Sequence, residues 1–202
     1  PADLLPFGIT GKIAYATGLD SYGSGNNSGS TLTHGAQTMG TSATEYQVKA
    51  SPIDGLTVGA SYIEFNEAGI STTQQQPESG SYMATYATGP FSVGYSKGLK
   101  APIVGALAAG AAVETVEYYD QQNMSVAYAA TDDLTISYEK ETSEANYVLN
   151  STADMEQKST GIQVAYTMGG MTLAVAHNSH DNNGYVDGAK QDQTLFAVTM
   201  AF

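Results

Sequence analysis

The sequence contains no cysteine, no tryptophan and no arginine. The lack of cysteine excludes a disulfide framework, a zinc–thiolate site and a cysteine nucleophile. Positive charge is scarce, since 7 basic residues stand against 20 acidic ones and the formal net charge is −13. Such a chain disfavours nucleic acid as a partner and draws cations toward any opening in its surface.

A long apolar run is also missing. A transmembrane helix needs about 18 or more consecutive apolar residues, and the longest stretch of small apolar residues, 101–113, is interrupted by Pro102, Gly105 and Gly110. This excludes a helical membrane span. No signal peptide is present and the chain begins at Pro1, so we interpret the sequence as a processed product or a fragment.

The dominant pattern is an alternation of large and small side chains with a period of two, which is typical of β-strands. In the last such segment, one face carries Thr194, Phe196, Val198, Met200 and Phe202. The opposite face carries Leu195, Ala197, Thr199 and Ala201, which are mostly small. The alternation predicts ten strands, at 9–18, 43–51, 56–65, 81–88, 91–98, 118–130, 134–141, 159–168, 171–179 and 192–202.

The connections between these segments alternate strictly between short and long. Turn signals of a few residues, such as 52–55 and 89–90, alternate with connections at 19–42, 66–80, 99–117, 142–158 and 180–191. This predicts an all-β fold, an antiparallel up-and-down transmembrane β-barrel in which residues 1–202 form a single segment. The alternative is a soluble sandwich, whose outer face is normally charged, whereas here the second face is rich in Ala, Gly, Ser and Thr.

Aromatic residues of the large face fall near both ends of the predicted strands. Barrels concentrate such rings at the two interfaces of an apolar band about 25 Å tall. The chain has 14 tyrosines, which suit this position. The rings near short turns or the terminus are Tyr86, Phe91, Tyr128, Tyr166 and Phe202, and those near long connections are Tyr62, Tyr95 and Tyr138.

The C-terminal segment 192–202 resembles the terminal signature of Gram-negative outer-membrane proteins, in which a final aromatic residue follows alternating apolar positions. The strand–turn–strand segment 46–60 resembles the units of the general porin family. The resemblance implies a homotrimer of wide barrels of about sixteen or more strands, of which this chain would supply the C-terminal part. In that family acidic residues on an inward loop face an arginine-rich wall, and this chain has no arginine.

A complete ten-stranded barrel is the alternative. Its interior would be narrow, and the many inward Gly, Ala and Ser residues would leave voids there, whereas a wide aqueous channel needs no packing. We therefore favour the incomplete wide barrel.

The predicted function is passive diffusion of small hydrophilic solutes, cations preferentially, through a porin in the bacterial outer membrane. Charged and amide side chains on the inner face would tune the field that a solute crosses. These predicted pore-lining residues are Lys12, Glu45, Gln47, Lys49, Glu139, Glu141 and Gln163. The expected partners are outer-membrane lipid and lipopolysaccharide, with no cofactor. The alternative is a surface receptor or adhesin that uses the long loops on a narrow barrel.

Catalytic and metal sites have little support in the sequence, so we expect no enzyme. His177 and Ser179 would project from one face, in a His-x-Ser spacing that resembles outer-membrane phospholipases, but no orienting residue or oxyanion donor is identified. The loop 181–188 alternates oxygen-bearing residues around glycine, as calcium loops do, and an ordinary turn explains it equally well. His34 stands alone in a polar loop.

Overall fold

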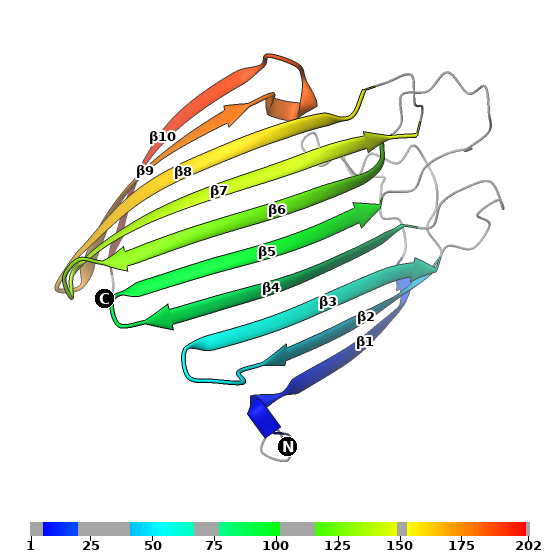
Figure 1. The fold of residues 1–202 in the computed structure, drawn as a ribbon, viewed down its shortest axis with the longest axis horizontal. Helices are drawn as coiled ribbons and strands as arrows, with labels where there is room; N and C mark the ends of the chain where they lie inside the picture. Colours follow the sequence, from blue (N-terminus) through cyan, green and yellow to red (C-terminus); the bar gives the residue numbers. More distant parts are fainter. Residues whose placement is uncertain (1–5, 20–40, 67–76, 102–115, 149–152, 201–202) are drawn as a thin grey trace.

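The computed structural model describes residues 6–19, 41–66, 77–101, 116–148 and 153–200. Within them, ten antiparallel strands form one sheet in which each strand pairs with its neighbours in sequence (Figure 1). The strands are β1 (Thr10–Leu19), β2 (Thr41–Ala50), β3 (Leu56–Asn66), β4 (Glu78–Thr88), β5 (Phe91–Ala101), β6 (Val116–Ala129), β7 (Leu134–Tyr147), β8 (Met155–Met168), β9 (Met171–Asp181) and β10 (Lys190–Met200). Two short 3-10 turns, η2 (Pro6–Gly8) and η3 (Asn183–Tyr185), complete the described structure.

The predicted fold class, all-β with antiparallel up-and-down strands, is confirmed. The four short turns lie at one end of the strands (Figure 1). β1 and β10 lie at the two edges of the sheet and are not paired with each other. Among the described residues, no helix is long and apolar enough to cross a membrane.

Several strands are longer than predicted at the end away from the short turns. β7 continues to Tyr147 although the prediction ended at 141, and β8 begins at Met155 although the prediction began at 159. The backbone pairing continues through Glu144↔Glu156 and Ala145↔Met155. In these extended ends of β7 and β8, polar side chains occur on both faces of the strand. The alternation of large and small side chains that marks the rest of each strand is therefore absent there.

The described residues enclose almost no hydrophobic core. The buried hydrophobic side chains among them are three alanines, Ala43, Ala101 and Ala145. The large side chains of β10 are exposed, with Phe196 at 75%, Val198 at 59% and Met200 at 55%. Their prediction as outward-facing residues agrees with this exposure, and Phe202 lies outside the described residues. The sheet is therefore a single layer with two open faces.

Glycine is required in the turn between β2 and β3. Gly55 has φ +77°, and a Cβ atom there would lie 2.2 Å from the carbonyl oxygen of Ala87. Gly89, in the turn between β4 and β5, has φ +53°, but a Cβ atom there would meet nothing within 4 Å.

We expect Gly89→Ala to reduce the free energy of unfolding by about 1 kcal/mol, the cost of a left-handed backbone for alanine. Gly55→Ala should cost at least about twice as much, because it adds a clash with backbone that cannot rotate away. Chemical denaturation of the two variants measures the difference. Equal losses would show that the close approach to Ala87 is not present in the folded chain.

Candidate functional site

One face of the sheet is lined by small and polar residues, and we call it the small-residue face. Directly paired residues on neighbouring strands share a face. One row of such pairs crosses nine strands from β2 to β10. It consists of Lys49, Gly59, Met83, Ser96, Asn123, Glu141, Ser159, His180 and Gln191.

The register places all seven predicted pore-lining residues on the small-residue face. Lys49 and Glu141 belong to the row itself. Four others lie on strands of the row, an even number of residues from its member on the same strand, and therefore share its face. Lys12, on β1, pairs with one of these four, Gln47. The four are Glu45, Gln47, Glu139 and Gln163. Their role in a pore stays a prediction.

The carboxylates of the small-residue face differ from strand to strand in whether a lysine balances their charge. On β1 and β2, the Nζ atom of Lys12 lies 3.3 Å from Oε2 of Glu45, so this carboxylate is balanced locally. On β7, Glu139 accepts a hydrogen bond from the side-chain amide of Asn123. Glu141 forms no ion pair or hydrogen bond with a described residue. Unbalanced negative charge therefore lies on β7.

A serine and a histidine meet on this face. The Oγ atom of Ser159 on β8 lies 2.8 Å from Nδ1 of His180 on β9. The pair was missed in the sequence because the two residues are 21 positions apart and only the strand register brings them together. The predicted pair of His177 and Ser179 is not formed. Both side chains lie on the face opposite to the small-residue face, as predicted, but Nδ1 of His177 contacts Oγ1 of Thr194 at 2.9 Å.

In the loop 181–188, for which the sequence left a calcium loop and an ordinary turn as alternatives, two of the oxygen-bearing side chains contact other groups of the protein. Oδ1 of Asp181 lies 3.0 Å from Nζ of Lys190, and Oδ1 of Asn182 accepts a hydrogen bond from the backbone N–H of Gly188 at 3.0 Å. The described part of the chain holds no group of three or more His, Asp or Glu side chains that could bind a metal. An ordinary turn therefore explains these residues better than a calcium loop does. His34 and residues 102–113 lie outside the described residues.

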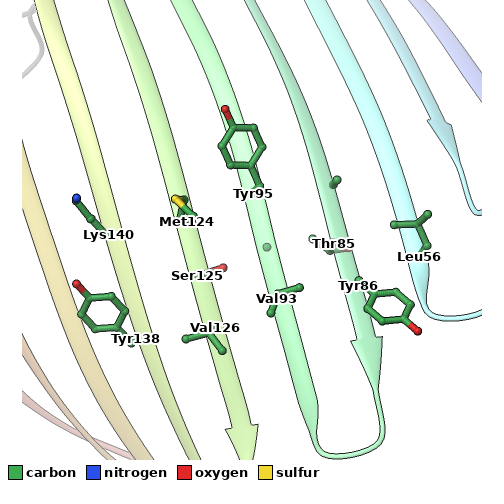
Figure 2. A pocket seen from close by; sticks show the side chains of 12 residues that line it. Leu56, Thr85, Tyr86, Val93, Tyr95, Met124, Ser125, Val126, Tyr138 and Lys140 are labelled. Carbon is green, nitrogen blue, oxygen red and sulfur yellow. The ribbon is translucent and has the colours of Figure 1, made fainter.

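The opposite, bulky face carries most of the large side chains of the sheet, although a few, such as Met83 and Leu195, lie on the small-residue face. A groove of about 540 Å³ lies between large side chains of this face. Figure 2 shows Tyr86, Tyr95 and Tyr138 among the residues that line it. Nearby, the rings of Phe91 and Tyr128 stack with centroids 4.7 Å apart. The groove is lined by Leu56, Ala84, Thr85, Tyr86, Val93, Gly94, Tyr95, Met124, Ser125, Val126, Tyr138 and Lys140.

Charges on the bulky face gather toward the long connections. On β8, Nζ of Lys158 lies 2.7 Å from Oε1 of Glu156, whereas the short-turn half of that strand presents apolar residues and Tyr166. On β5, Nζ of Lys97 lies 2.9 Å from Oδ2 of Asp120 on β6. The bulky face therefore changes from apolar near the short turns to charged near the long connections.

Comparison with known proteins gives little beyond the fold. No protein-family model matches the chain, and no curated protein matches it. Among solved structures, the chain is similar to OmpT (in-vitro folded), an outer membrane protein of Vibrio cholerae, with 14% sequence identity and a TM-score of 0.49. The match covers 78% of this chain and 52% of OmpT, so the chain spans about half the length of that protein.

The prediction that the chain is not an enzyme is corrected. A fold does not decide which chemistry its side chains perform, so an all-β sheet gives no ground for excluding an enzyme. In addition, the contact between Ser159 and His180 is of the kind that activates a serine hydroxyl. The exclusion of enzymatic activity is therefore withdrawn.

Proposed function

We propose that the chain forms part of the wall of an outer-membrane pore through which small hydrophilic solutes diffuse, with cations preferred. The observation that carries the proposal is a single-layer antiparallel sheet whose bulky apolar face and small polar face are both exposed. A water-soluble sheet would have to cover the bulky face. In a bilayer that face meets lipid, and the small-residue face borders water.

The two edges of the sheet support a wider barrel. In a membrane every backbone N–H and C=O group needs a partner within the protein, so the outer edges of β1 and β10 require further strands. Those strands would come from a longer polypeptide or from association. We retain the general porin family, a homotrimer and surrounding lipopolysaccharide as parts of this proposal, and the C-terminal part of a wide barrel as the place of this chain.

The two faces of β10 can be tested with adjacent residues. We expect Phe196→Lys to destabilise the protein in lipid vesicles by about 2 kcal/mol or more, because it places a charge against lipid. Leu195→Lys is the matched control, since Leu195 lies on the small-residue face and its lysine would meet water; its cost should stay below about 1 kcal/mol. Urea unfolding from vesicles measures both. The proposal fails if Leu195→Lys is the more damaging change.

The acidic residues of β7 should set the preference for cations. In planar bilayers the complete barrel that contains this chain should give stepwise ohmic conductance, and Glu139→Gln with Glu141→Gln should lower the cation-to-anion permeability ratio obtained from reversal potentials. Glu144→Gln is the control, because Glu144 lies on the bulky face of the same strand. A barrel that inserts but never conducts would remove the pore function, and an equal effect of Glu144→Gln would remove the role of the inner carboxylates.

A hydrolase is a second candidate function, favoured by the contact between Ser159 and His180. A histidine nitrogen 2.8 Å from a serine oxygen can accept the hydroxyl proton as the oxygen attacks a carbonyl or phosphoryl group. Two polar residues flank this pair in the same row of the sheet: Glu141 on β7 lies opposite Ser159, and Gln191 on β10 lies opposite His180.

If this pair is catalytic, a fluorophosphonate probe should label the intact protein, and Ser159→Ala or His180→Asn should each abolish labelling. Ser179→Ala, on the bulky face, should leave labelling unchanged. An unlabelled parent protein would end the hydrolase hypothesis without affecting the pore.

A further inference from the structure

The connection between β9 and β10, residues 182–189, folds onto the small-residue face; we call it the 182–189 loop. Its central residue, Tyr185 of η3, places its hydroxyl 2.6 Å from Oγ of Ser143 on β7. The Tyr185 ring also lies against Tyr119 on β6, with the centroids 5.3 Å apart. Ser143 is only 2% exposed. The side chain of Tyr185 therefore reaches across β8 to contact one residue of β7 and one of β6 on the small-residue face.

Hydrogen bonds hold the backbone of the loop to β8. The side-chain amide of Asn182 donates to the carbonyl oxygen of Glu156 at 2.9 Å, and the N–H of Gly184 donates to Oε1 of Gln157 at 2.8 Å. Within the loop, the N–H of Asn183 donates to the carbonyl oxygen of Ala189 at 2.9 Å. These contacts fix both sides of η3.

The backbone of the loop is strained where it is held. Asn182 has φ 53° and Tyr185 has φ 60°, both in the left-handed region. Asparagine tolerates this region, but for a large side chain such as tyrosine it costs about 1 kcal/mol or more. The contacts of the Tyr185 ring and hydroxyl must offset this cost, so Tyr185 determines the position of the loop.

The electrostatic surroundings keep the Tyr185 hydroxyl neutral. Burial raises the pKa of Tyr185, and the nearby carboxylate of Glu141 raises it further, although the hydrogen bond with Ser143 acts in the opposite direction. A neutral phenol retains the proton that it can donate to Ser143. The ring is thus a fixed apolar body beside the unbalanced acid on β7.

We propose that Tyr185 is a size-determining residue of the pore, because the 182–189 loop that it anchors projects from the wall over β6, β7 and β8. This inference rests on the proposed pore function. A loop that is held to β8 and extends the ring of Tyr185 over β7 and β6 narrows the passage at that level for every solute that follows the wall. Since the carboxylate of Glu141 lies close enough to raise the pKa of Tyr185, the solutes that we expect to be screened by size there are hydrated or organic cations.

The size limit can be measured with tetraalkylammonium ions of increasing diameter as current carriers through the complete barrel that contains this chain, in planar bilayers. Tyr185→Ala removes the ring and its hydroxyl, so we expect the permeability of the largest passing ion, relative to potassium, to rise several-fold. Tyr185→Trp places a larger ring at the same position and should lower that ratio, which keeps the test informative if the alanine variant does not fold.

Val186→Ala is the matched control, because Val186 follows Tyr185 in the same loop and its side chain is 58% exposed. It should leave the size series unchanged. A conducting parent whose size series is the same in the Tyr185→Ala and Tyr185→Trp variants would overturn the role of Tyr185 and leave the pore intact. A parent that does not conduct would overturn the pore function itself.

Discussion

The structure depends on hydrogen bonds between neighbouring strands, because almost nothing else holds it together. A single layer with three buried alanines as the hydrophobic core of its described part gains little from packing. Lateral pairing along ten strands satisfies the backbone, and the bulky side chains stabilise the sheet only when something apolar covers them. A bilayer supplies that cover without a second protein layer, which is why the same pairing pattern favours a membrane wall.

Once pairing is fixed, the period of two decides which side chains border water. Every residue of the row from Lys49 to Gln191 follows from the register of its neighbours, so a slip by one residue would move Glu141 and His180 to the bulky face together. The short turns help to fix that register. Gly55, with φ +77°, precedes β3 directly and allows a turn that brings its backbone against Ala87 on the neighbouring strand β4.

The sequence predicts the strands, turns and faces because these depend on local alternation and on glycine, which a single chain displays openly. It does not predict the extended ends of β7 and β8, because side chains there are polar on both faces and the period disappears. The contact of Ser159 with His180 was also missed, since it depends on the register of two strands. The 182–189 loop was predicted only as a turn or a calcium loop, because nothing local indicates that Tyr185 would reach Ser143.

In the pore that we propose, size selection and charge selection would be coupled through one strand, β7. Glu141 and Ser143 are successive inward residues of β7, so the group that supplies unbalanced negative charge lies beside the group that anchors Tyr185. A cation drawn toward Glu141 therefore meets the 182–189 loop at the same level of the wall. Changes in the charge of β7 would alter the surroundings of the Tyr185 hydroxyl as well as the field in the pore. The two properties cannot be tuned independently as long as the hydrogen bond between Ser143 and Tyr185 is kept.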